Sequence, residues 1–221
     1  RPGQYEITGW PKFEAVRALI PDPRRFFDNA NLVAVYNPHF DQRVGSWARM
    51  GLSILDFFVA HPQYNLIFAP HLVLFKRRWR HRAMLPDRYR HVPNILVDTD
   101  SAALADMTYL DAADIYLGDV SSQVYEFLIR PRPCVFLDAH GVDWEADPHY
   151  AHWRFGPVVT DVARDLGPML SDAVANQPQF LPPHIPKQSP EESRPATKAL
   201  LAARRFTAPG PGCWCSRWAA A

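Results

Sequence analysis

The sequence lacks any apolar run long enough to cross a bilayer, and it carries almost no net charge. A membrane-spanning helix needs roughly 20 consecutive apolar residues, and no run approaches that length. The 24 basic and 23 acidic residues leave a net charge of +1, whereas nucleic-acid-binding domains usually carry a marked basic excess. We therefore expect neither a membrane span nor a nucleic-acid partner.

Cysteine is also scarce, and its placement excludes two kinds of site. Cys134 lies in the apolar run PCVFL and is predicted to be a small core residue. Cys213 and Cys215 are separated by one residue, and no second cluster supplies the remaining ligands of a zinc site. We expect no metal, no cofactor, no disulfide framework and a reducing compartment.

The body of the chain alternates strand and helix patterns. Apolar, often β-branched runs predict strands over residues 31–36, 65–69, 94–97, 114–117, 133–137 and 157–160. Apolar residues at helical spacing predict helices over residues 47–60, 102–112, 122–129 and 162–175. Strands that are apolar throughout and alternate with helices predict an α/β, Rossmann-like doubly wound parallel sheet over residues 31–176. Residues 177–221 begin rich in proline and are predicted to be an extended or disordered tail.

Polar residues follow each of the first five predicted strands. The segments are residues 37–41, 70–71, 98–101, 118–122 and 138–141. In an open parallel sheet, ligands bind beyond the carboxyl ends of the strands. We therefore expect these five loops to form one ligand-binding rim.

The segment Gly118-Asp119-Val120-Ser121-Ser122 is the most informative of the five. Two hydroxyls at the start of a helix, beside backbone N–H groups, can seat a diphosphate. The same serines can instead cap the helix. Spacing alone leaves both interpretations open.

Three other rim positions have a functional and an ordinary interpretation. His71 follows a strand that ends in Ala-Pro, and it can support a diphosphate leaving group or be a simple loop histidine. His39 invites the same argument. Asp98 and Asp100 can hold a ribose or cap the following helix, and we favour capping.

A basic segment, residues 76–90, holds seven Lys or Arg with Trp79 and Tyr89 between them. It is suited to an anionic membrane surface or an anionic polymer acceptor. A solvated loop explains it equally simply.

Taken in order, several motifs resemble those of the CDP-glycerol glycerophosphotransferases. Residues 7–13 (ITGWPKF) resemble that family's interdomain stretch, and residues 35–38 (VYNP) and 68–71 (FAPH) resemble two of its strand ends. Residues 112–122 (AADIYLGDVSS) are similar to its serine signature, and Glu126 falls on an acidic position of the family. The resemblance covers residues 5–175.

The resemblance implies the C-terminal, donor-binding half of a GT-B fold. Residues 1–30 would then be an interdomain segment, and a partner N-terminal Rossmann domain would be missing. By position, His71 would be catalytic and assist the donor diphosphate, Ser121 and Ser122 would bind its phosphates, and Asp119 would shape their loop. Glu126 would face the nucleotide or its ribose, and His39 would lie in the same donor site.

The implied activity is transfer of glycerol phosphate, or a similar polyol phosphate, from a CDP-linked donor. The acceptor would be membrane-associated, and the protein would be cytoplasmic or peripheral on the inner face of the cell membrane. His39 stands where the family has Thr, and Asp119-Val120 replaces Asp-Tyr. Two alternatives therefore remain. One is a GT-B glycosyltransferase that uses another nucleotide-diphosphate donor, namely a nucleotide sugar. The other is a non-catalytic nucleotide-binding fragment.

Overall fold

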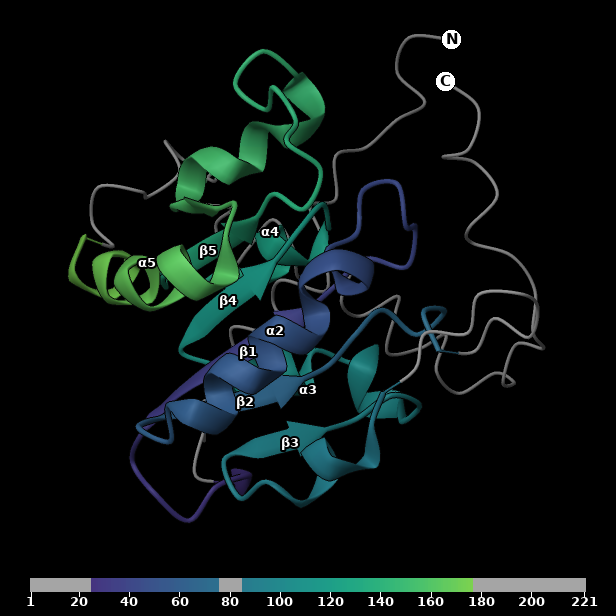
Figure 1. Ribbon diagram of the computed structural model, residues 1–221, viewed down its shortest axis with the longest axis vertical. Helices are drawn as coiled ribbons and strands as arrows, with labels where there is room; N and C mark the ends of the chain where they lie inside the picture. Colours follow the sequence, from purple (N-terminus) through teal and green to yellow (C-terminus); the bar gives the residue numbers. More distant parts are fainter. Residues whose placement is uncertain (1–24, 76–84, 177–221) are drawn as a thin grey trace, which may run out of the picture. The chain divides into compact units, whose positions relative to one another are not determined.

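All six predicted strands are present and form one parallel sheet. The structure, a computed structural model, describes residues 25–75 and 85–176. Its strand order is β3-β2-β1-β4-β5-β6 (Figure 1). The strands are β1 (Leu32–Asn37), β2 (Tyr64–Phe68), β3 (Ile95–Val97), β4 (Ile115–Gly118), β5 (Cys134–Leu137) and β6 (Val158–Val159). Every pairing is parallel, which confirms the α/β, Rossmann-like prediction.

Helices cover both faces of this sheet. Helices α2 (Trp47–Ala60) and α5 (Val162–Asn176) lie side by side on one face. Short helices α3 (Thr108–Ala112) and α4 (Gln123–Phe127) and the 3-10 helix η4 (Pro148–Phe155) cover the other. Two further 3-10 helices, η2 (Asp87–His91) and η3 (Ala102–Leu104), flank β3.

Alternate residues of each strand feed two separate cores. In β1, Ala34 and Tyr36 pack with α2 and α5, while Val33 and Val35 pack with α3 and α4. Because both faces are buried, both residue sets must be apolar. This is why the strands are continuous apolar runs.

The predicted helix over residues 102–112 is wrong. The segment forms η3 and α3, separated by Met107 with a left-handed backbone (φ 71°). The hydroxyl of Ser101 accepts a hydrogen bond from the Ala103 N–H, and the carboxylate of Asp106 accepts one from Thr108. Such local bonds compete with a continuous helix. The helix predicted over 122–129 is likewise shorter, as α4.

Some predictions fall on residues that the structure does not describe. Three predicted segments lie outside the described residues: residues 7–13, which resemble an interdomain stretch, most of the basic segment 76–90, and the tail 177–221. The domain boundaries at residues 30 and 177 therefore stay predictions.

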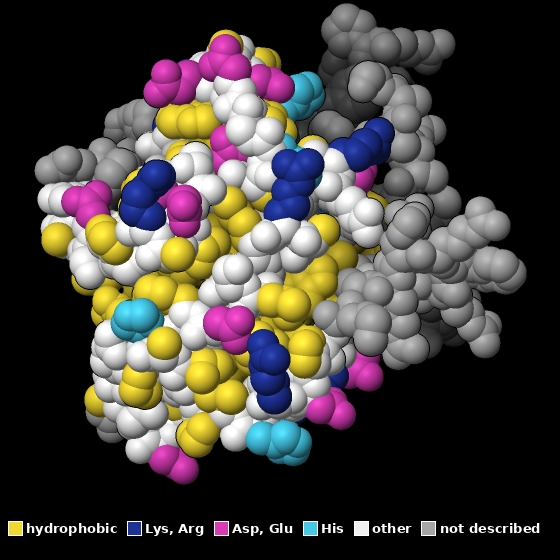
Figure 2. All heavy atoms as spheres, in the orientation of Figure 1, with side chains coloured by type: hydrophobic (Ala, Val, Ile, Leu, Met, Phe, Trp, Pro, Cys, Tyr) yellow, Lys and Arg dark blue, Asp and Glu magenta, His cyan; other side chains and the backbone are white. Residues whose placement is uncertain are grey.

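The face that carries α2 and α5 shows mixed charge. Basic and acidic side chains are interspersed there with apolar ones (Figure 2). On α5, Arg164 and Asp165 form an ion pair. In the described part of the chain, no helix has both the length and the apolar character to cross a bilayer.

We predict that Gly156→Ala destabilises the domain. A Cβ at Gly156 would lie 2.0 Å from the carbonyl oxygen of Cys134, in the backbone of β5. Relieving that clash requires β5 to shift, which we expect to lower the free energy of unfolding by about 1–3 kcal/mol. Urea denaturation measures the change.

Gly167→Ala is the matched control, because a Cβ there meets only the Phe57 ring at 3.4 Å. Alanine is favoured over glycine within a helix by up to about 1 kcal/mol. We therefore expect equal or greater stability for this variant. Equal stabilities of the two variants would contradict the packing described for Gly156.

Candidate functional site

The sheet has its topological switch point between β1 and β4. The chain moves outward from β1 through β2 to β3, and then returns to place β4 on the other side of β1. Asn37, the last residue of β1, pairs with Gly118, the last residue of β4. Ligands of open α/β sheets bind at such a point. The candidate site is therefore built from the loops that follow these two strands and their neighbours.

Asp119 joins the loops that follow β1 and β4. Its carboxylate accepts hydrogen bonds from the backbone N–H of His39 (2.9 Å), and from the N–H (2.6 Å) and hydroxyl (2.8 Å) of Ser46. The residue is fully buried. Burial raises the pKa of Asp119 to about 6, against the opposing effect of these hydrogen bonds. Asp119 therefore holds the rim together and does not present its carboxylate to a ligand.

The backbone of Asp119 is fixed from η4 as well. Its carbonyl oxygen accepts from Nε1 of Trp153 (3.4 Å) and lies 3.3 Å from Nε2 of His152. A carbonyl oxygen can only accept, so His152 carries its proton on Nε2. Burial lowers the pKa of His152, although this bond opposes the shift.

Ser121 and Ser122 differ in what their hydroxyls do. The Ser121 hydroxyl accepts from the N–H of Gln123 at 3.2 Å and so closes a local turn. Ser122 is exposed at the N-cap of α4 and makes no side-chain capping bond. A local bond to the backbone thus accounts in part for the hydroxyl of Ser121, whereas no capping bond accounts for the hydroxyl of Ser122. Because α4 has only five residues, its dipole adds little, and a phosphate seat here depends on the hydroxyls and backbone N–H groups.

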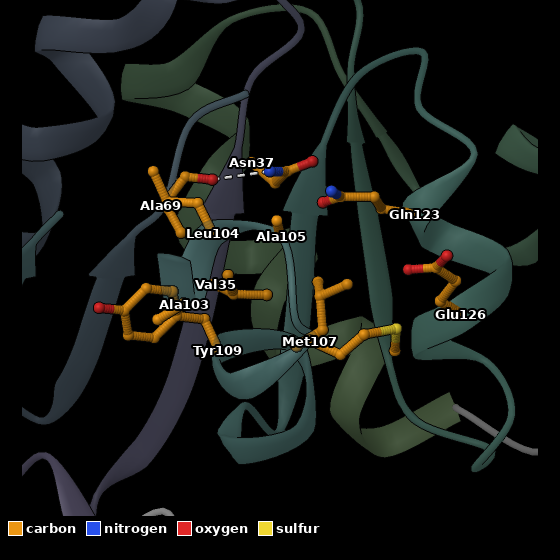
Figure 3. A pocket seen from close by; sticks show the side chains of 11 residues that line it. Val35, Asn37, Ala69, Ala103, Leu104, Ala105, Met107, Tyr109, Gln123 and Glu126 are labelled. Atoms are coloured by element: carbon orange, nitrogen blue, oxygen red, sulfur yellow. Dashed lines mark hydrogen bonds between the residues drawn. The ribbon is translucent and has the colours of Figure 1, made fainter. Parts of the chain in front are cut away.

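A small pocket lies against the α3 and α4 side of the sheet, and Gln123 at the start of α4 lines it (Figure 3). Its cavity volume is only about 10 Å³, room for about one water molecule, and the rest of the hollow is open to solvent. Its floor is apolar and includes Val35, Leu104 and Met107. Polar side chains at its edge are Asn37, Gln123 and Glu126. An apolar pocket with a few convergent polar groups is typical of small-molecule sites.

Helix α4 supplies two of the polar groups. Figure 3 shows the Gln123 amide and the Glu126 carboxylate reaching from α4 toward the pocket. Glu126 is buried, with 7% of its surface exposed. The Asn37 amide donates to the carbonyl oxygen of Ala69 at 2.6 Å, which ties β1 to the end of β2. Glu126 thus lies at the pocket, and its contact with a nucleotide stays a prediction.

His39 and His71 lie together at the ends of β1 and β2. Their ring centroids are 5.8 Å apart, and the Phe40 ring lies 4.4 Å from His39 and 4.6 Å from His71. Burial, and secondarily the nearby His71, lowers the pKa of His39 to about 4, although Asp41 opposes the shift. Burial also lowers the pKa of His71. Both rings are therefore neutral at neutral pH.

The loop after β3 turns inward on Asp98. Its carboxylate accepts from the N–H groups of Asp100 (3.1 Å) and Ser101 (3.0 Å), and from the hydroxyls of Ser101 and Tyr109. Burial would raise the pKa of Asp98, but these bonds leave it lowered. Asp98 therefore bonds the loop in which it lies, whereas the residue that caps the following helix η3 is Ser101.

Asp138 plays the same part after β5. It accepts from the N–H groups of His140 (3.0 Å), Gly141 (2.7 Å) and Val142 (3.1 Å). The predicted convergence of five polar loops is thus present, but their buried aspartates serve the loops themselves. No group of three potential metal-ligating side chains occurs among residues 25–75 and 85–176.

Three residues of the site were not singled out from the sequence. Ser46 is fully buried and connects Tyr36 (2.9 Å) to Asp119. Asn37 was noted only as the end of a strand, and Gln123 only as part of a helix. A polar residue that ends a buried strand was the available signal for Asn37. No local pattern marks Ser46, because its partner is 73 residues away.

No family model and no curated protein matches the chain. Among solved structures, the chain is similar to a histidine-to-asparagine variant of the wall teichoic acid polymerase TagF. The TM-score is 0.58 at 13% identity, over 89% of this chain and 52% of that one. The same variant soaked with CDPG gives 0.53 at 14% identity, over 88% of this chain and 46% of that one.

A more distant match is the UDP-GlcNAc 2-epimerase from Neisseria meningitidis bound to UDP-GlcNAc. Its TM-score is 0.47 at 15% identity, over 80% of this chain and 46% of that one. The chain spans about half the length of the structures it matches, 52% of the TagF variant. At these identities the likeness concerns the fold alone. The described domain therefore has a Rossmann-like fold similar to that of TagF, as the sequence predicted.

Proposed function

We propose that this chain is the donor-binding half of a GT-B-type transferase that moves a polyol phosphate from a CDP-linked donor. The observation that carries the proposal is the arrangement at the switch point. There the Ser121–Ser122 turn, the Glu126 pocket and the two histidines surround the carboxyl ends of β1, β2 and β4. The similarity of the fold to that of TagF, a teichoic acid polymerase, also supports this proposal.

Each group has a defined part in this proposal. Ser122, with the backbone of its turn, binds the donor diphosphate. Glu126 accepts hydrogen bonds from the ribose or base at the pocket edge. Asp119 is a positioning residue, because it contacts only the protein. His71 acts at the diphosphate.

The proposed reaction is an in-line displacement at the β-phosphorus of the donor. The acceptor hydroxyl oxygen forms a bond to that phosphorus, the bond to the bridging oxygen breaks, and CMP leaves with the electron pair. The hydroxyl proton passes to a base, which we place on a companion domain. A hydrogen bond from His71 stabilises the charge that develops on the leaving phosphate.

Competition calorimetry tests the choice of donor. We expect the chain to bind CDP-glycerol more tightly than UDP-GlcNAc. Preference for UDP-GlcNAc would identify a nucleotide-sugar site, and absence of binding to either compound would refute the proposed function.

Ser122→Ala should weaken CDP-glycerol binding about tenfold, because a hydrogen bond to a charged group contributes roughly 1.5–3 kcal/mol. Inorganic pyrophosphate binding should weaken similarly, since Ser122 is proposed to contact phosphate. Calorimetric titration measures both. Ser53→Ala is the control, because Ser53 is exposed on α2, and we expect it to bind like the unmodified chain. Unchanged binding by Ser122→Ala would show that the Ser122 hydroxyl does not bind phosphate.

Glu126→Gln should distinguish binding of the nucleoside from binding of the diphosphate. The substitution keeps the size of the side chain but removes the charge and one acceptor. We expect CDP-glycerol binding to weaken about tenfold while pyrophosphate binding stays the same. Equal losses for the two ligands would show that Glu126 acts on the phosphates or on the whole domain.

Asp119→Asn should lower stability by about 1–3 kcal/mol, because the amide group then faces donors that had a carboxylate acceptor. Urea denaturation measures this loss. Asp143→Asn is the control, since Asp143 is exposed after β5, and its change should stay within about 0.5 kcal/mol. Equal stability of the two variants would contradict the role of Asp119 in joining the loops.

A further inference from the structure

The backbone fixes the relative placement of His39 and His71. The N–H of His71 donates to the carbonyl oxygen of Pro38 at 3.1 Å, so the loops after β1 and β2 are directly bonded. Phe40 packs against both rings, with its centroid 4.4 Å from that of His39 and 4.6 Å from that of His71. The N–H of His39 is held by Asp119, next to the serine turn. The two imidazoles are thus a preformed pair beside the proposed phosphate seat.

The hydrogen bonds at Nδ1 identify the tautomer of each ring. Nδ1 of His39 lies 3.1 Å from the backbone nitrogen of Asp41, and Nδ1 of His71 lies 3.2 Å from that of Val73. A backbone N–H can only donate, so each Nδ1 must accept. The proton of each neutral ring therefore lies on Nε2.

The same bonds resist protonation of the rings. A second proton on a ring would have to occupy Nδ1, which would place two donors face to face and break the bond to the backbone. Burial acts in the same direction, because it lowers the pKa of both histidines. For His39 the nearby His71 adds to this effect, since a charge on one ring disfavours a charge on the other.

The neighbouring charged groups do not reverse this preference. Bonds from Arg43 lower the pKa of Asp41 to about 2, so its charge is constant near neutral pH. Asp119 contacts the backbone of His39 and not its ring. The His140 ring lies 3.1 Å from the carbonyl oxygen of Gly45 through its own Nε2.

We propose that His39 and His71 bind the donor diphosphate as neutral hydrogen-bond donors through Nε2–H, and that binding takes up no proton. This inference rests on the proposed function and makes His39 a phosphate-binding residue alongside His71. A neutral pair attracts an anion by directed hydrogen bonds, and it needs no counter-charge in a half-buried site. Affinity should then be constant across neutral pH.

Calorimetry with CDP-glycerol tests the inference on the unmodified chain. Both phosphates of this probe are esterified, so its own charge is constant near neutral pH. Titrations in two buffers of different ionisation enthalpy give the number of protons exchanged. We expect about zero protons, and less than about a twofold change in Kd between about pH 6.5 and 8. Uptake of about half a proton or more, with tighter binding at the lower pH, would overturn the inference.

A pair of substitutions tests the tautomer. The amide nitrogen of glutamine reaches the position of Nε2–H, whereas the asparagine amide reaches only that of Nδ1. We expect His39→Gln to bind within about threefold of the unmodified chain and His39→Asn to bind about tenfold more weakly. Failure of glutamine to restore binding would oppose a neutral donor, and the proton count decides the matter even if His39→Asn does not fold.

His61→Asn is the control. His61 lies at the end of α2, before β2, and stacks on Phe57 at 4.0 Å. It should leave the affinity and the proton count unchanged. Absence of CDP-glycerol binding at every pH would instead refute the proposed function, so the two failures are distinguishable.

Discussion

The candidate site depends on one buried carboxylate at the switch point of the sheet. Asp119 has no contact with solvent and binds the N–H of His39 and two donors of Ser46. A buried charge is tolerated only when hydrogen bonds replace the lost water. Here those bonds come from the loop that begins after β1 and leads into α2. The same residue therefore sets the position of the first loop, the start of α2 and, through its own backbone, the serine turn.

Buried aspartates at three strand ends follow the same principle. Asp98, Asp119 and Asp138 each accept several backbone N–H bonds in the loops around them. They shape the rim, whereas Ser122 and the two histidines are the groups that we propose to contact a ligand. From the sequence, all of these residues are simply polar side chains after strands. A carboxylate that binds loop N–H groups and one that binds a ligand differ in burial and partners, which the sequence does not display.

The regular elements were predictable where burial on both faces imposes a pattern. Strand β1 and helix α2 match their predictions because each must fill a core with apolar side chains at a fixed period. The segment around Met107 was not predictable in this way. Its apolar spacing permits a helix, but bonds from Ser101 and Asp106 to nearby N–H groups favour a break. Those bonds depend on the backbone geometry. They do not alter the spacing of apolar residues along the sequence, so that spacing does not reveal the break.

Burial lowers the pKa of the two histidines, and the partner of Nδ1 acts in the same direction. A carboxylate at that atom would favour the imidazolium, whereas the backbone N–H groups of Asp41 and Val73 favour the neutral ring. The contributions of Asp119 and His39 to stability have opposite pH dependence. The raised pKa of Asp119 makes its contribution to stability greatest at low pH. The lowered pKa of His39 makes the contribution of that ring greatest above its unfolded value of about 6.5. Between about pH 4 and 6 the two contributions oppose each other. Near neutral pH the His39 ring is therefore neutral, while its backbone N–H stays bonded to Asp119, and a neutral ring is the state that the proposed diphosphate site requires.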